Sequence, residues 1–385
     1  MVVYSYYPFD PRVRKEVRAL VARSCKVDVI CLRDENETNK EIVDGATIYR
    51  IPLSAKRGGY LTYCYQYLTF FVLSFFLLTK LFLTNRYDVI HIHSLPDFQV
   101  FVALVPRLFR RRIILDLHEA MPEIFAARFD LDMDSGRVAL AAFLERISFK
   151  FSDIVLTVNK TIKARLVGRG LDPEKIIIIM NSPDEELRRE RDMSRFIKEN
   201  DLESKFVLVY VGGINQERNI EALIGAVGWV RKEIPIRMFI YGYGKREYIE
   251  ELKRLRSALQ LDKEIRFGGW IPHEDVFSFL KLSDVGIISY VRNPLTEIAI
   301  PNKVFEFIAL RKPLIIAKLG ALEELFKGAA LFYEPGDSED LAEKILRLCR
   351  DEELANRLVA RAVRVHEECN WDVMKKRLYA AYDLN

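Results

Sequence analysis

The sequence predicts an α/β fold made of two doubly wound domains of similar size, and three observations support this. Its 385 residues are enough for two hydrophobic cores, since a domain holds roughly 150 residues. Short apolar runs of strand length alternate with longer segments of helical period, which is typical of parallel sheets covered by helices. A charge-dense stretch without apolar period, at 182–200, interrupts this alternation and is the expected linker.

The first half predicts one parallel sheet, because helical segments separate most of its strand-length runs. The expected strands are 2–6, 27–32, 46–52, 89–93, 113–117, 154–158 and 176–180. The expected helices are 11–22, 60–83, 98–109, 137–151 and 160–168.

The second half restarts the same alternation and ends in helices. The expected strands are 206–211, 237–241, 265–267, 285–289, 313–317 and 329–332. The expected helices are 219–233, 248–259, 273–282, 302–310, 339–349, 352–369 and an amphipathic segment at 371–382.

The composition excludes several classes of protein. Lys and Arg number 59 against 55 Asp and Glu, and this net charge of +4 is too even for a protein that binds nucleic acid with its whole surface. The five cysteines include no C-x-x-C pair, so we expect neither a disulfide framework nor a zinc knuckle. The first residues do not read as a signal peptide, and we expect a cytoplasmic protein.

One segment is unusually apolar. Residues 58–79 carry no charge, and the region 50–114 around them has nine basic and two acidic residues. Three interpretations stay open: a core or interdomain helix, a helix on an anionic membrane surface, and a membrane span. A span would separate strands that belong to one sheet.

Ligands of doubly wound sheets bind beyond the carboxyl ends of the strands, so the loops there are the candidate sites. Gly212 and Gly213 follow a strand and let the backbone approach a ligand, and Arg218 stands near the start of the next helix, where it could hold phosphate. A tight turn with a surface arginine is the alternative. Tyr241 and Gly242 end the next strand, in a G-x-G that lacks the third glycine of a dinucleotide site.

Two further loops complete this candidate site. Trp270 and Ile271 could lie beside a nucleobase, or form a plain turn. The densest motif runs through Ala299, Ile300, Pro301, Asn302, Lys303 and Glu306. Lys303 and Glu306 share a helical face, so they could hold a phosphate and a sugar hydroxyl, or merely form a surface ion pair.

The first half has fewer candidates. His118 and Glu119 follow a strand, and His118 is either functional or structural. His91 and His93 share a strand face, but no third metal ligand is visible, and we expect no metal. The D-x-D at 130–132 does not follow a predicted strand and reads as a polar loop.

Together these motifs resemble the retaining family-4 glycosyltransferases of the GT-B fold, the group 1 glycosyl transferases, over nearly the whole chain. The matching segments are YSYYPFDPRVRKEVRAL, YDVIHIHS, LDLHEAMPE, SDIVLTVNKTIKARLVGRG, VYVGGINQERNIEALIGAV, FGGWIPHEDVFSFLKLSDVGIISY and AIPNKVFEFIALRKPLI. The resemblance implies two Rossmann-like domains facing a cleft. It places the acceptor domain at 1–186 with the last helix at 370–385, and the nucleotide-sugar domain at 187–369.

The resemblance also implies residue roles. Glu306 would bind the ribose, Arg218 and Lys303 the diphosphate, and His118 the donor sugar. The family's first motif acid falls on Ile298, so Glu297 is one residue away, and Gly213 replaces a usual basic residue. The other expected donor-binding residues are Gly212, Gly213, Tyr241, Gly242, Trp270, Ile271, Ala299, Ile300, Pro301 and Asn302. The expected acceptor-binding residues are Asp10, Arg12, His93 and Glu119, with Asp10 and Arg12 in place of a glycine-rich loop.

The implied activity is metal-independent transfer, with retention, from a UDP- or GDP-type sugar to a lipid-linked or cell-surface glycan. No cofactor is expected, and the basic, apolar 50–114 region would contact the cytoplasmic face of an anionic membrane. A sugar-nucleotide epimerase of the same fold and an inactive nucleotide-binding homologue are the alternatives.

Overall fold

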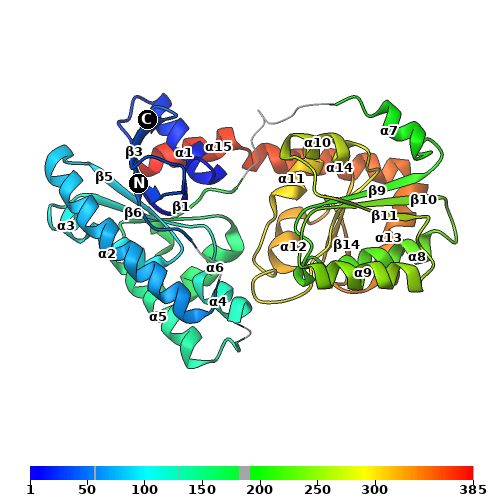
Figure 1. Cartoon of the computed structure of the whole chain (residues 1–385), viewed down its shortest axis with the longest axis horizontal. Coiled ribbons are helices and arrows are strands. Elements are labelled where there is room, and N and C mark those ends of the chain that lie inside the picture. Colours follow the sequence, from blue (N-terminus) through cyan, green and yellow to red (C-terminus); the bar gives the residue numbers. More distant parts are fainter. Residues whose placement is uncertain (56–57, 130, 182–190, 385) are drawn as a thin grey trace. The chain divides into compact units, whose positions relative to one another are not determined.

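A computed structural model describes residues 1–55, 58–129, 131–181 and 191–384, and the chain folds as two compact units (Figure 1). Unit 1 comprises Met1–Asn181 and Trp371–Asn385, and unit 2 comprises Ser182–Asn370. The expected boundary after residue 186 lies outside the described residues, as does the first half of the expected linker. The rest of that linker contains a short helix, α7 (Ser194–Glu199).

Unit 1 is built on one eight-stranded sheet of order β3-β4-β2-β1-β5-β6-β7-β8, parallel except for β3. Its strands are β1 (Val2–Tyr6), β2 (Asp28–Leu32), β3 (Lys40–Val43), β4 (Ala46–Ile51), β5 (Val89–His93), β6 (Arg112–Leu117), β7 (Ile154–Thr157) and β8 (Ile176–Ile178). Since the chain proceeds from β1 to β2 on one side and later adds β5 on the other, the direction of winding switches between β1 and β5. The predicted parallel sheet is confirmed.

Strand β3 was absent from the predicted elements. It is an exposed edge strand, and it pairs with β4 through a two-residue turn at Asp44 and Gly45. Both turn residues have positive φ, 52° and 79°, which is the geometry of the turns that best fit a twisted hairpin. The Asp-Gly pair was therefore the signal for this strand.

Helices cover the sheet of unit 1. They are α1 (Pro11–Ala22), α2 (Tyr60–Asn85), α3 (Leu104–Leu108), α4 (Met121–Phe129), α5 (Gly136–Phe151), α6 (Lys160–Gly168) and α15 (Trp371–Ala381), with 3-10 turns η1 (Asp97–Ala103) and η2 (Pro173–Lys175). The single helix expected at 98–109 is thus η1 followed by α3, and α4 was not predicted. The D-x-D at 130–132 precedes α5; Asp130 lies outside the described residues, and residues 131–135 form a turn.

Helix α15 returns to unit 1 from the far end of the sequence. The Tyr379 hydroxyl donates to the Ala19 carbonyl of α1 at 3.1 Å, and the Met180 N–H donates to the Met374 sulfur at 3.1 Å. Just beyond it, Tyr382 reaches His91 of β5 (2.7 Å).

Helix α2 connects β4 to β5 and meets the rest of unit 1 along a narrow stripe. The buried stripe, at four-residue spacing, consists of Gln66, Phe70, Ser74, Leu78 and Phe82. The opposite side is also apolar and exposed, and only 22% of the most apolar 18-residue window is buried. By length and composition Leu61–Asn85 could cross a membrane. The core-helix interpretation is therefore wrong for most of its surface.

Unit 2 has two three-stranded parallel sheets, β11-β10-β9 and β12-β13-β14. The strands are β9 (Phe206–Val211), β10 (Ile236–Tyr241), β11 (Ile265–Gly269), β12 (Gly286–Ile288), β13 (Leu314–Ala317) and β14 (Leu331–Tyr333). The Asp284 N–H donates to the Val207 carbonyl at 2.9 Å, which brings β12 beside β9. The resulting order is that of a doubly wound fold, with its switch between β9 and β12.

The remaining helices of unit 2 follow the predicted pattern, apart from one α-helix and one short 3-10 turn. They are η4 (Gln216–Arg218), α8 (Ile220–Val230), α9 (Arg246–Ala258), α10 (His273–Lys281), α11 (Asn302–Ala309), α12 (Gly320–Phe326), α13 (Ser338–Arg350) and α14 (Glu352–Cys369). The unpredicted α12 begins with glycine and is only seven residues long. The fold class, an α/β chain of two Rossmann-like domains, is confirmed.

Candidate functional site

Glycine backbones line the carboxyl ends of β9, β10 and β11 in unit 2. The Gly212 N–H donates to the Tyr241 carbonyl (3.0 Å), and the Gly242 N–H donates to the Gly269 carbonyl (2.7 Å). Gly242 has a φ of 149°, and a Cβ there would lie 1.7 Å from the Gly212 oxygen. A side chain is thus excluded at Gly242, and the glycines at these strand ends leave backbone that a ligand can approach closely.

Arg218 ends η4, directly after this glycine loop, and is tied to the neighbouring strand. The Ser289 hydroxyl, just after β12, donates to the Arg218 carbonyl at 2.8 Å. The guanidinium lies over the Tyr290 ring, 4.5 Å from its centroid. Among the described residues, no carboxylate forms an ion pair with Arg218, and its Nε is buried without a hydrogen bond. Its charge is therefore not neutralised at the switch of unit 2.

Lys303 brings a second cation to this place. Its side chain passes over Gly212, where an added Cβ would lie 3.7 Å from the lysine Cε. Burial lowers the pKa of the Lys303 ammonium, Glu306 raises it, and nearby Arg218 lowers it further. The Lys303 Nζ lies 3.6 Å from Glu306 Oε2, so the predicted i,i+3 pair exists. That Glu306 oxygen is buried and accepts no hydrogen bond within the described part of the chain.

The N-terminus of α11 is also uncapped by any side chain. Pro301 occupies the position before the helix, and Asn302 is its first, exposed residue. Ala299 and Ile300 precede it and are partly exposed. The free N–H groups of the first turn of α11, to which Lys303 belongs, therefore carry the positive end of the helix dipole.

The other predicted donor-binding residues lie on neighbouring loops. Trp270 is exposed and follows β11, and Ile271 is partly exposed. Tyr241 is buried beneath the edge, since its ring fills the space beside Gly268.

Glu297 has a different environment from the one expected. Its Oε1 accepts from Arg292 Nη1 at 2.6 Å, and its Oε2 accepts from the Gly320 N–H at 2.7 Å, at the start of α12. Both oxygens thus hold the loop to α12. Ile298, where the family has its first acid, is buried.

In unit 1, His118 follows β6 and is its most accessible histidine. The His118 side chain is 21% exposed. The backbone N–H of His118 donates to the hydroxyl of Ser94, which follows β5 (3.3 Å). Its Nε2 lies 3.3 Å from Asp116 Oδ2 and 3.1 Å from His93 Nδ1. The Nε2 edge of the His118 ring therefore contacts two buried side chains, those of Asp116 and His93.

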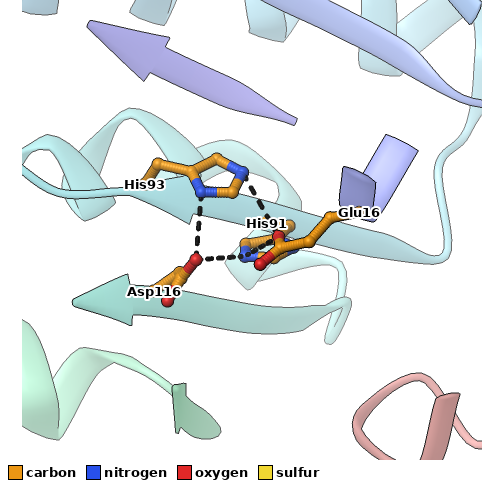
Figure 2. Close-up of side chains that lie close together, drawn as sticks. All are labelled: Glu16, His91, His93 and Asp116. Carbon is orange, nitrogen blue, oxygen red and sulfur yellow. Dashed lines mark hydrogen bonds and ion pairs between the residues drawn. The ribbon is translucent and has the colours of Figure 1, made fainter. Parts of the chain in front are cut away.

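Those buried groups form a cluster that sequence reasoning missed, made of Glu16, His91, His93 and Asp116 (Figure 2). They come from α1, β5 and β6, and one ligand atom from each lies within 4.8 Å of the others. Burial raises the pKa of Glu16 well above its ordinary value and lowers the pKa of His93 well below its own. Burial alone would raise the pKa of Asp116, but Arg12 and the histidines hold it well below the usual range.

The structure places two predicted acceptor-binding residues elsewhere. Arg12 is buried and donates to both Asp116 oxygens, to the Ile179 carbonyl and to Asn181, and His93 is fully buried. Neither side chain is available to an acceptor, because both are buried and form hydrogen bonds with Asp116 inside unit 1. Asp10 caps α1 by accepting from the Arg12 and Val13 N–H groups (3.2 Å each), and Glu119 is exposed.

The two histidines of β5 now have further polar neighbours. Sequence alone offered no third ligand, because Glu16 and Asp116 lie far from His91 and His93 along the chain. Tyr290 was also missed, although its position two residues after β12 was a usable signal.

Comparison with protein families gives two matches in chain order. Residues 10–182 match the glycosyl transferase 4-like domain, and residues 205–351 match the glycosyl transferases group 1. Together they account for most of the chain.

Individual relatives are distant but similar over long stretches. A chitobiosyldiphosphodolichol beta-mannosyltransferase of Kluyveromyces lactis is 24% identical over 302 residues, 72% of this chain and 66% of that protein. This chain thus spans about two thirds of that relative. Among solved structures, sucrose-phosphate synthase from Thermosynechococcus elongatus superposes with a TM-score of 0.75 at 17% identity, covering 97% of this chain and 92% of the other. HepE of Anabaena in complex with UDP superposes with a TM-score of 0.74 at 15% identity, covering 99% and 98%.

Proposed function

The chain belongs to the group 1 glycosyltransferases of the GT-B fold, and we propose that it transfers a sugar from a nucleoside-diphosphate sugar, with retention of configuration and without a metal ion. The observation that carries this proposal is the pair of cations, Arg218 and Lys303, at the switch of unit 2. Only Glu306 balances them among the described groups that form ion pairs there. A diphosphate supplies the missing negative charge.

Each group of this site has a task in such a reaction. As the anomeric bond loosens, negative charge grows on the leaving diphosphate. Arg218, Lys303 and the N-terminus of α11 are fixed donors for that charge, each contributing about 3 kcal/mol to the transition state. Because these cations take the place of a divalent ion, no metal is needed. The unsatisfied Glu306 Oε2 suits the hydroxyls of a ribose.

Nucleotide binding is the first test. Thermal unfolding of the whole protein would be followed with UDP, GDP or ADP, since a ligand at about 100 times its Kd stabilises by roughly 2.7 kcal/mol. We expect UDP or GDP to stabilise and Arg218→Ala to abolish the effect. The control is Arg231→Ala. Arg231 directly follows α8, at the end of the helix opposite to Arg218, and it donates to the Gln260 carbonyl (2.6 Å). Equal stabilisation of the Arg218→Ala variant would contradict the proposal.

The reaction class needs a separate test. Product analysis with the stabilising nucleotide as sugar donor separates transfer from epimerisation, since an epimerase needs no acceptor. The anomeric configuration of the product, read by NMR, decides whether it is retained.

We further propose that α2 and α3 dock on the cytoplasmic face of an anionic membrane, where the acceptor is a lipid-linked or cell-surface glycan. Leu61, Phe76 and Leu108 are 80%, 67% and 74% exposed, and the helices also expose Tyr65, Leu68, Leu83 and Phe109. We call these seven residues the apolar face. Lys80, Arg86 and Arg110 are exposed on the same helices or at their ends.

Surface docking fits these observations better than a membrane span. Strands β4 and β5, which α2 connects, belong to the same sheet, and a span would pull them to opposite sides of a bilayer. The named lipid-diphosphate mannosyltransferase relative gives a precedent for a lipid-linked acceptor.

Vesicle sedimentation tests this part. We expect binding to phosphatidylserine vesicles that weakens as salt rises, and little binding to phosphatidylcholine vesicles. The double variant Phe76→Ser, Leu108→Ser should bind about tenfold more weakly or worse, because each side chain adds about 1.5–3 kcal/mol when buried in lipid. Ile42→Ser removes an equally exposed apolar side chain on β3 and should have no effect. Binding that ignores both salt and the double substitution would contradict docking by this face.

A further inference from the structure

Helix α5 of unit 1 exposes a side made of apolar and basic residues, and nothing in the proposed site uses it. We propose that α5 is a second membrane-binding helix, whose exposed side rests on the same anionic lipid surface as α2 and α3. Leu140 and Phe143 enter the headgroup region of the bilayer, and Arg146 and Lys150 contact the anionic headgroups. This inference rests on the docking proposed above for α2 and α3, but it concerns residues outside the apolar face.

The exposed side of α5 has the pattern of a helix that lies on a membrane. Residues three apart in a helix follow one another at steps of about 60° around its axis. Arg137, Leu140, Phe143 and Arg146 are spaced in this way, and all four are exposed. Leu140 and Phe143 are 55% and 58% exposed. Two bulky apolar side chains thus lie between basic ones, as in interfacial helices, whose apolar residues enter the lipid while the cations stay at the headgroups.

The exposed charges of α2, α3 and α5 are all positive. Segments 60–87, 97–111 and 136–151 contain eight Lys and Arg residues and two acids. The two acids, Asp97 and Glu145, are fully buried. Two of the arginines pair with acids outside these segments, and the other six basic residues form no ion pair with a described residue. This surplus of positive charge is complementary to an anionic lipid surface.

Helix α5 belongs to the same layer as α2 and α3. The connections from β4 to β5, from β5 to β6 and from β6 to β7 all proceed in one direction along the sheet. Right-handed crossovers therefore bring α2, α3 and α5 to one face of it. The turn η1 contacts both longer helices. The ring centroid of its Phe98 lies 6.0 Å from that of Phe71 in α2. The centroid of its Phe101 lies 5.0 Å from that of Phe151 in α5. One flat surface can therefore contact α2 and α5 together.

A second copy of the chain is the competing occupant, since two apolar faces could cover each other. The charges favour the membrane. In a symmetric dimer the same patch is used on both subunits, so Arg137, Arg146 and Lys150 of one copy would lie close to their own counterparts. Like charges brought together in this way repel, whereas an anionic lipid surface attracts all of them.

Sedimentation of the full chain with phosphatidylserine vesicles tests the apolar part. We expect the double variant Leu140→Ser, Phe143→Ser to bind about tenfold more weakly than wild type, because two side chains no longer enter the lipid. Ile42→Ser, on the edge strand β3, is the matched control and should bind like wild type. The substituted side chains are all exposed, so the unfolding temperature should not change.

A second pair of variants tests the basic part. Arg146→Gln, Lys150→Gln should weaken binding about tenfold and reduce its dependence on salt, since two cations are lost. The matched control is Lys232→Gln, Lys263→Gln, which removes two exposed charges of unit 2 and should bind like wild type. Equal losses in the two variants would contradict a role for α5, because net charge alone would then explain them.

The outcomes separate this inference from the proposed function. If Phe76→Ser, Leu108→Ser loses binding while both α5 variants keep it, α2 and α3 dock alone and the inference is overturned. It is also overturned if wild type does not bind the vesicles, or if wild type is a dimer in solution that Leu140→Ser, Phe143→Ser dissociates. Stabilisation by UDP or GDP is measured without vesicles, so it stands or falls separately from each of these results.

Discussion

In both units, charged residues lie near the carboxyl ends of the parallel strands, but the charges are balanced in unit 1 and left unbalanced in unit 2. In unit 1, Arg12, Glu16, His93 and Asp116 are buried and contact one another. In unit 2, Arg218 and Lys303 stand together with only Glu306 to balance them. A network whose charges already cancel supports the fold and orients a neighbouring side chain. A surplus of positive charge costs some stability and attracts an anionic ligand.

The largest effect on stability should come from breaking the buried network of unit 1, in which the charges balance. We expect Arg12→Met to lower the free energy of unfolding by about 3–5 kcal/mol, because it leaves Asp116 buried without its partner. Urea unfolding measures this. The matched control is Arg14→Met on the same helix, whose partner Asp44 lies 2.9 Å away in a half-exposed pair worth about 1 kcal/mol or less. Equal losses in the two variants would contradict the comparison.

The second largest effect should come from the unbalanced cations of unit 2, and we expect it in turnover. Arg218→Ala should reduce turnover about a hundredfold or more, since one preorganised donor to the leaving group is lost. Its free energy of unfolding should change by less than about 1 kcal/mol, because no described carboxylate pairs with Arg218. Near-normal turnover would contradict the assignment of this edge as the diphosphate site.

The pH dependence of stability sharpens the comparison further. The pKa of Glu16 is raised in the folded state, so its stabilising contribution is complete below the ordinary value of about 4.5 and is lost as pH rises through the folded pKa. Glu16→Gln removes this dependence. We expect the difference in unfolding free energy between wild type and variant to change with pH above 4.5, by at most about 1.4 kcal/mol per pH unit. Parallel pH profiles would show that Glu16 ionises normally in the fold.

The smallest effect should come from Glu297 of unit 2, because both of its carboxylate oxygens already accept hydrogen bonds. Glu297→Gln weakens the contacts to Arg292 and to the start of α12, and we expect a loss of about 1 kcal/mol in stability. Turnover should fall far less than in Arg218→Ala. A hundredfold loss of turnover at unchanged stability would instead restore the catalytic role that the family motif suggests.

Much of the architecture could be predicted, because local patterns carry it. Helix α14 has the predicted bounds, 352–369, since its apolar period is uninterrupted and both ends are marked by polar residues. That Arg218, Lys303 and Glu306 lie near one another could be predicted, because the carboxyl ends of parallel strands meet at one edge. Their role in binding a ligand stays a prediction. The edge strand β3 was missed because its residues are exposed and lack an apolar pattern.

The predictions that failed concern side chains whose surroundings come from distant parts of the chain. Arg12 and His93 were expected to bind the acceptor, yet both are buried and both contact Asp116, which lies 104 residues beyond Arg12 in the sequence. For α2 the composition was clear, but which of its sides is covered depends on the packing of β1, β4 and η1.

The sequence by itself determined two doubly wound domains, the glycosyltransferase family and the loops that we propose as ligand sites, since these depend on periodicity and on residues close together in the chain. Only the tertiary structure decided which charges cancel one another and which are left for a ligand. Electrostatic energy depends on distances of a few ångströms between residues that the sequence keeps far apart.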